Sequence, residues 1–192
     1  KGSTFWFTAD FEKQTQAKET LPAPSADIKG KRVLAADNNA TRLLFLSDYL
    51  KSWGCYYGSA SNARDSLSLL HQAVKDGAAF DLVIIDQMMP DMDGETLGKI
   101  IKEDPTLKDT RLVLLTSQAQ RGDAARAKKI GFDAYLTKPL KFSLLFKCLV
   151  TVLAHHPNQA AQGQEPAFVT RYTIAESMKH RVHILLAEDN EI

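Results

Sequence analysis

Five short apolar segments alternate with five longer amphipathic segments through the middle of the chain, and this alternation constrains the fold more than any other feature. Two of the short segments, Leu82–Ile85 and Leu112–Leu115, are entirely aliphatic. Strands have such continuous patterns when helices cover both faces of their sheet, because neither face meets water. We therefore expect strands at Arg32–Ala36, Tyr56–Ser59, Asp81–Ile85, Arg111–Thr116 and Ala134–Leu136.

The longer segments carry their apolar residues at helical spacing. In the range Ser61–Asp76 these residues fall on one helical face, and Gly77 is a typical residue to follow a helix end. The expected helices are Thr41–Trp53, Ser61–Asp76, Thr96–Glu103, Asp123–Ile130 and Phe142–Ala154. Strands that alternate with helices predict an α/β fold with a doubly wound, five-stranded parallel sheet and helices on both faces.

Composition excludes several classes of protein. Of 192 residues, 44% are hydrophobic and 24% are charged, and the formal net charge of +1 gives no reason to expect a nucleic acid or a membrane surface as partner. No stretch approaches the about 20 apolar residues of a membrane helix, and the first ten residues do not resemble a signal peptide. The two cysteines, Cys55 and Cys148, are too few for a disulfide scaffold or a zinc cluster. We expect a cytoplasmic location, although the parent protein could be anchored in a membrane.

Polar side chains follow the expected strands at their carboxyl ends. Asp37 and Asn38 follow the first strand, Asp86 follows the third, Thr116 ends the fourth and Lys138 follows the fifth. In open α/β sheets, ligands bind beyond the carboxyl ends of the strands. If the first and third strands are neighbours, these side chains converge on one site.

The chemistry of this set is coherent. Clustered carboxylates raise one another's pKa, so a divalent cation or a lysine is needed to keep them ionised, and oxygen ligands favour Mg²⁺. An ionised aspartate can attack phosphorus, while a cation and a hydroxyl stabilise the transferred group. Each residue alone also has an ordinary role: Asp86 can start a loop, Thr116 can end a strand, Lys138 can lie in a solvated turn and Asp37 can cap a helix. Their joint occurrence favours a site.

From about Lys31 to Leu153 the chain resembles a receiver domain of two-component signalling. The resemblance implies a flavodoxin-like sheet with strand order 2-1-3-4-5, and Asp86 as the acceptor of a phosphoryl group from a partner's phosphohistidine. It also implies that Mg²⁺ is held by Asp37, Asn38, Asp86 and the backbone carbonyl of Met88. The family usually has a second acid where this chain has Asn38. Because an amide adds no charge, we expect weaker Mg²⁺ binding than in a typical receiver, and slow or absent phosphorylation.

The resemblance assigns three further positions. Thr116 would bind the phosphoryl group, Lys138 would pair with it, and Tyr135 stands at the aromatic switch position of the family. The Lys138–Pro139 bond would be cis, which an X–Pro bond adopts at small cost.

The ends of the chain suggest a larger parent protein. The segment 181–192 repeats the pattern of Val33–Asn39, as the first strand of a truncated second receiver would, and GSTFWFT within 1–13 resembles the closing strand of a histidine-kinase ATPase domain. The receiver itself is expected at 30–156, with linkers at 14–29 and 157–180. The parent would then be a hybrid sensor histidine kinase.

Two functions remain open. The first is a phospho-accepting receiver that switches a partner-binding face. The second is a degenerate pseudo-receiver that acts as a phosphate-independent interaction or dimerisation module; Asn38 favours it, whereas Asp86, Thr116 and Lys138 oppose it. An aspartate-nucleophile phosphatase is disfavoured because Met88 stands where its general acid is needed. No histidine lies in a kinase-like acceptor motif, so we expect no independent enzyme beyond phosphorylation and dephosphorylation of the aspartate itself.

The expected partners are a phosphohistidine donor, the neighbouring kinase and receiver domains, and a second copy of the chain. The last expected helix, Phe142–Ala154, is apolar around most of its circumference, and its polar residues Ser143, Lys147 and Thr151 form one narrow stripe. A helix that covers one side of a sheet needs an apolar face of only about 100°. The helix is therefore either tightly wedged in the core or part of a dimer or interdomain surface.

Overall fold

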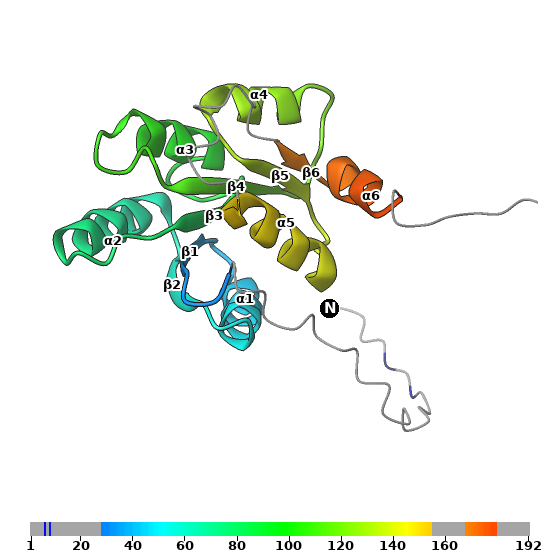
Figure 1. Ribbon diagram of the computed structural model, residues 1–192, viewed down its shortest axis with the longest axis horizontal. Coiled ribbons are helices and arrows are strands. Elements are labelled where there is room, and N and C mark those ends of the chain that lie inside the picture. The colour runs from blue at the N-terminus through cyan, green and yellow to red at the C-terminus, as the bar shows by residue number, and fades with distance from the viewer. Residues whose placement is uncertain (1–5, 7, 9–27, 155–167, 180–192) are drawn as a thin grey trace, which may run out of the picture.

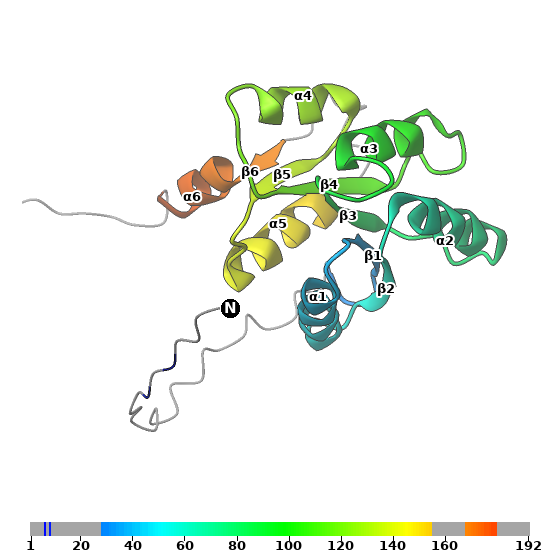
Figure 2. The same ribbon diagram turned by 180° about the vertical axis from the view of Figure 1, so that it is seen from behind.

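A computed structural model describes residues 6, 8, 28–154 and 168–179. Its sheet has six parallel strands in the order β2-β1-β3-β4-β5-β6, with helices on both faces (Figures 1 and 2). The strands are β1 (Arg32–Ala36), β2 (Tyr56–Ala60), β3 (Leu82–Asp86), β4 (Arg111–Thr116), β5 (Ala134–Thr137) and β6 (Val169–Thr170). The predicted flavodoxin-like order of the first five strands is confirmed.

The helices pack in two layers. They are α1 (Ala40–Ser52), α2 (Ala63–Lys75), α3 (Gly94–Glu103), α4 (Asp123–Ile130), α5 (Phe142–Ala154) and α6 (Arg171–Lys179). Residues of α1, α5 and α6 form one buried cluster, and residues of α2, α3 and α4 form another on the opposite face. Successive residues of β1 alternate between these clusters, with Val33 and Ala35 in the first and Leu34 and Ala36 in the second. This double burial explains the continuous aliphatic pattern of the strands.

The sixth strand corrects the expected count of five. β6 extends the sheet beyond β5, with Val169 opposite Ala134 and Thr170 opposite Tyr135. Both β6 and α6 fall inside the range 157–180, which the sequence analysis treated as a linker. Val169 and Ile174 are 3% and 5% exposed, so burial of these two apolar side chains holds the segment against the edge of the sheet.

The extra segment, β6 and α6, covers part of the surplus apolar surface of helix α5. Leu145, Cys148 and Leu149 are buried in the core, as expected for a wedged helix. Ile174 of α6 belongs to the same buried cluster, and α6 contacts α5. A segment of the same chain therefore covers one side of α5. The sequence alone allowed this side to face either the core or a partner. Among the described helices, none has the length and apolarity needed to cross a bilayer.

Most of the expected outer segments lie outside the described residues. Of the expected kinase strand at 1–13, only residues 6 and 8 are described, and the side chain of Trp6 is exposed. The expected second-receiver strand at 181–192 is not among the described residues. Ile28, by contrast, falls in the expected linker 14–29 but is completely buried in the hydrophobic core.

The start of α3 lies against the end of β3. A Cβ atom added to Gly94 would lie 2.6 Å from the backbone oxygen of Asp86, so a residue without a side chain is needed at this position. Asp93 caps the helix by accepting a hydrogen bond from the backbone N–H of Thr96 at 2.7 Å. The loop from Asp86 to Gly94 is thereby fixed at the carboxyl edge of the sheet.

Candidate functional site

The two buried carboxylates that the sequence predicted to converge do lie together. β1 pairs directly with β3, and Ala36 opposite Ile85 is the last pair between these two strands, so Asp37 and Asp86 come directly after that pair. The side chains of Asp37 and Asp86 are 3% and 1% exposed. Two buried acids at one place require cations nearby.

Lys138 provides one of these cations. Its Nζ lies 2.7 Å from Oδ1 of Asp86 and 3.7 Å from Oδ2 of Asp37. The backbone N–H of Lys138 donates to the carbonyl oxygen of Thr116 at 2.7 Å, and the Lys138–Pro139 bond is cis. The end of β5 thus delivers the ammonium group to the carboxylates.

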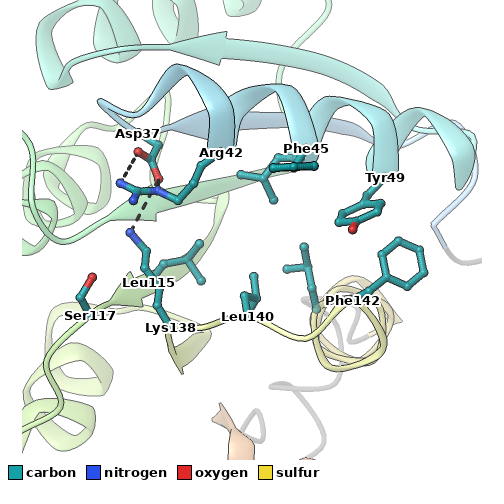
Figure 3. A pocket seen from close by; sticks show the side chains of 11 residues that line it. Asp37, Arg42, Phe45, Tyr49, Leu115, Ser117, Lys138, Leu140 and Phe142 are labelled. Carbon is teal, nitrogen blue, oxygen red and sulfur yellow. Dashed lines mark hydrogen bonds and ion pairs between the residues drawn. The ribbon is translucent and has the colours of Figure 1, made fainter. Parts of the chain in front are cut away.

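Arg42, which the sequence analysis did not single out, provides a second cation. From the first turn of α1 its Nε donates to Oδ2 of Asp37 at 2.6 Å, and its Nη2 donates to Oδ1 of Asp37 at 2.7 Å and to Oδ2 of Asp86 at 2.9 Å. Figure 3 shows the Arg42 and Lys138 side chains pointing toward Asp37. The hydrogen bond to Asp37 raises the pKa of the guanidinium against the opposing effect of burial, and the charges of both acids add to it.

The two asparagines after Asp37 have different roles. Asn39 caps α1, because its side chain accepts a hydrogen bond from the backbone N–H of Arg42 at 3.0 Å. Asp37 is therefore not the cap; its Oδ1 accepts the N–H of Asn39 at 2.7 Å. Asn38 is exposed, and its Oδ1 lies 3.5 Å from Nη2 of Arg42, which is long for a hydrogen bond.

In this arrangement the residues do not fit a magnesium ion. All four carboxylate oxygens of the two acids already face donors: Arg42 engages both oxygens of Asp37 and one of Asp86, and Lys138 faces the other. The backbone N–H of Met88 also donates to Oδ1 of Asp86, at 3.2 Å. Among the described residues, no group of three or more histidine, cysteine and acidic side chains is placed to hold a metal. Two positive charges already balance the two negative ones.

Thr116 and Tyr135 lie on the other side of Asp86. Thr116 is one residue beyond Leu115, the register partner of Asp86, and is 4% exposed. Its hydroxyl donates to the carbonyl oxygen of Gln118 at 2.8 Å and accepts the N–H of Gln118 at 3.2 Å. The hydroxyl is thus engaged with the loop after β4. Thr116, Tyr135 and Met88 line a common cavity of about 420 Å³.

The ring of Tyr135 is turned into the protein. It is 7% exposed, and its hydroxyl lies 3.4 Å from Oδ2 of Asp123, the first residue of α4. Burial raises the pKa of the Tyr135 phenol, and the Asp123 charge adds to the effect. The backbone N–H of Gln120 and the side chain of Arg126 hold the pKa of Asp123 below its ordinary value. The hydroxyl of Tyr135 therefore lies beside the N-terminus of α4.

A second cavity, of about 410 Å³, opens beside the acids between α1 and α5. Asp37, Arg42 and Lys138 line one end, and Tyr49 and Phe142 line the other (Figure 3). The rings of Tyr49 and Phe142 meet edge to face, with centroids 4.2 Å apart. The charged group is therefore reached through a cavity with apolar walls.

Comparisons with known proteins identify the family of this domain. The family model for the response regulator receiver domain matches residues 33–150. Response regulator PleD of Caulobacter vibrioides is 33% identical over 115 residues, which are 60% of this chain and 24% of PleD. Hybrid signal transduction histidine kinase L of Dictyostelium discoideum is 28% identical over 141 residues, 72% of this chain and 8% of that protein.

Among solved structures, the chemotaxis protein CheY4 of Vibrio cholerae is 28% identical, with a TM-score of 0.57 over 64% of this chain and 98% of CheY4. The chain thus spans about a quarter of the length of PleD and nearly all of CheY4. This chain belongs to the receiver domain family of two-component response regulators.

Proposed function

We propose that this receiver domain accepts a phosphoryl group on Asp86 from a phosphohistidine of a partner kinase or phosphotransfer domain. The observation that carries the proposal is the buried ion pair between Asp86 and Lys138, 2.7 Å apart at the carboxyl edge of the sheet. A carboxylate oxygen of Asp86 is the nucleophile in this proposal, and the ammonium group of Lys138 lies directly beside it. Arg42 and Lys138, the two cations beside Asp86, also line a cavity that a donor group could occupy.

In the proposed transfer, a carboxylate oxygen of Asp86 attacks phosphorus, an O–P bond forms and the P–N bond to the donor ring breaks. The electron pair of that bond stays on the ring nitrogen, so a ring protonated at its other nitrogen leaves as neutral imidazole. Lys138 and Arg42 lie where they can offset negative charge on the phosphoryl oxygens. Thr116 would turn its hydroxyl from Gln118 to the new group.

Receiver domains generally bind Mg²⁺ at this site, where the ion supplies positive charge to the phosphoryl oxygens. In this chain its ligands would be Asp37, Asn38, Asp86 and the backbone carbonyl of Met88. We propose that Mg²⁺ binds weakly, because Asn38 contributes no charge and the oxygens of both acids already have donors.

The proposed switch links Asp86 to the face formed by α4, β5 and α5. Thr116 and Tyr135 line one cavity, so movement of the Thr116 hydroxyl changes the space available to the ring of Tyr135. Tyr135 in turn contacts Asp123 at the start of α4. A two-state equilibrium of this kind would alter the surface offered to a partner, including a second copy of the chain.

A degenerate pseudo-receiver is the second candidate, and specific contacts favour it. The charges of Arg42 and Lys138 by themselves match those of Asp37 and Asp86, as a purely structural polar cluster would require. In that case the domain would act through its surface alone.

We further propose that the parent protein is a hybrid sensor histidine kinase. The similarity to the Dictyostelium hybrid kinase supports this context, as do the kinase-like segment within 1–13 and the second-receiver pattern at 181–192. The neighbouring kinase and receiver domains would then be the first partners of this domain.

Incubation with acetyl phosphate, followed by intact mass spectrometry, separates the two functions. A phospho-acceptor gains the mass of one phosphoryl group, and the Asp86→Asn variant does not. A chain that gains no such mass from acetyl phosphate or phosphoramidate, with or without Mg²⁺, is a pseudo-receiver. The Asp48→Asn variant is the matched control, because Asp48 is exposed on α1.

A further inference from the structure

We propose that Arg42 is the built-in cation of this site: its guanidinium occupies the carboxylate oxygens that a divalent ion would need and replaces that ion in the phosphoryl transfer. The binding part of this inference stands by itself, whereas the transfer part rests on the proposed function. The proposal concerns one residue of α1 and the two acids that it joins.

The contacts of Arg42 are those of a bridging cation. One guanidinium bonds both oxygens of Asp37 and reaches Asp86 at 2.9 Å. A guanidinium matches a carboxylate in this forked geometry, which the single ammonium of a lysine cannot reproduce. Because the Asp37 and Asp86 side chains are 3% and 1% exposed, few water molecules compete for the same oxygens.

The charges of the site support the same conclusion. With an amide at Asn38, the site holds two carboxylates, and Arg42 and Lys138 supply two positive charges. A divalent ion added to this set would leave an excess of two positive charges in a partly buried place. The ion can bind only if Arg42 gives up its hydrogen bonds to both acids, so the two cations exclude each other.

Arg42 is also placed to act on an incoming phosphoryl group. Its side chain is 39% exposed, unlike the acids that it joins, and it lines the cavity that opens beside them. Lys138, which lies 2.7 Å from Asp86, lines the same cavity, so a group bound there is close to both cations of the site. Arginine stabilises the spread charge of a transferred phosphoryl group in other phosphoryl-transfer sites, so Arg42 can supply positive charge at the place where a metal ion would supply it.

Metal titration tests the binding part. Mg²⁺ is titrated by isothermal calorimetry into the chain, into Arg42→Ala and into Arg42→Gln, with Arg64→Ala as the control; Arg64 is an exposed arginine at the start of α2. We expect Arg42→Ala and Arg42→Gln to bind Mg²⁺ about tenfold more tightly than the unchanged chain, or more, and Arg64→Ala to bind like the unchanged chain. Equal affinity in a folded Arg42 variant overturns the proposal.

A measurement on the unchanged chain covers the case in which neither variant folds. The NMR signal of the Arg42 Nε–H group, which donates to Asp37, should stay in place when millimolar Mg²⁺ is added. A saturable shift of this signal at such concentrations overturns the proposal as well.

The transfer part is tested with acetyl phosphate in excess EDTA. We expect the unchanged chain to gain the phosphoryl mass at a similar rate with EDTA and with Mg²⁺, and Arg42→Gln to gain it only with Mg²⁺. An adduct on the unchanged chain that requires Mg²⁺ overturns metal-independent transfer. If no adduct forms under any condition but the Arg42 variants bind Mg²⁺ more tightly, the proposed function fails and the exclusion of the metal by Arg42 stands.

Discussion

Replacement of Asp86 by asparagine should destabilise the domain, and the sign of this effect is informative. Where buried carboxylates repel one another, neutralising one of them relieves the repulsion and stabilises the fold. Here each acid is matched by a cation: Asp86 faces Lys138 at 2.7 Å and Arg42 at 2.9 Å. Asp86→Asn leaves two cations against the single charge of Asp37.

The size of the effect follows from the contacts that remain. Removing one partner of a buried ion pair costs about 3–5 kcal/mol when the other charge is left alone. In this site Arg42 keeps both bonds to Asp37, Lys138 stays 3.7 Å from Asp37, and the new amide oxygen can still accept one hydrogen bond. We therefore expect a loss of about 1–3 kcal/mol in the free energy of unfolding.

Urea denaturation followed by tryptophan fluorescence measures this loss. The chain has two tryptophans; Trp53 is completely buried, whereas Trp6 is 84% exposed, so the change in signal reports on Trp53. The titration is run in EDTA, and Asp48→Asn serves as the control, with an expected change within about 0.5 kcal/mol. If Asp86→Asn is as stable as the unchanged chain or more stable, the argument that the two acids are fully paired is wrong.

Three other expectations follow from the fold. Gly94→Ala places a Cβ atom 2.6 Å from the backbone oxygen of Asp86 and should cost about 1–3 kcal/mol in urea denaturation; unchanged stability would contradict this packing. Burial raises the pKa of Cys55 to about 11 and of Cys148 to about 12, so both thiols should stay protonated and resist Ellman's reagent at pH 8 until the chain unfolds. Because the folded chain favours the protonated thiols, this contribution to stability is fully present below the ordinary cysteine pKa of about 8.5. It is lost as the pH rises through the raised pKa values of the folded chain. Ile174→Asp puts a charge at a position 5% exposed and should abolish hydrogen-exchange protection of α6 alone; unchanged protection would refute its docking.

The central fold could be predicted because its signal is strong. Leu82–Ile85 and Leu112–Leu115 each have four consecutive aliphatic residues. This pattern predicts a strand covered on both faces, as observed. The polar residues at the strand ends then locate one edge of the sheet. β6 escaped this reasoning because two residues are too few to show a period. Its burial depends on the neighbouring β5, which periodicity within the segment does not reveal.

The candidate site could be predicted in its position but not in its contacts. Asp37, Asp86 and Lys138 were placed together by the strand ends alone. Arg42 was not predicted, because in the sequence it looks like a solvent-facing residue of a helix. Side chains in helices lean toward the N-terminus, and this general rule could have indicated that the Arg42 side chain lies over Asp37. The hydroxyl of Thr116 was expected at Asp86, but it bonds the loop at Gln118, a choice of rotamer that the sequence pattern does not fix.

Borohydride trapping tests the central claim most directly. Acetyl phosphate is added to the chain, the acyl phosphate is reduced with sodium borohydride, and tryptic peptides are sequenced by mass spectrometry. A phosphorylated aspartate is converted to homoserine, and the account predicts homoserine at residue 86 and at no other aspartate. Homoserine at Asp37 or at an exposed aspartate such as Asp48, or none at residue 86, would contradict it.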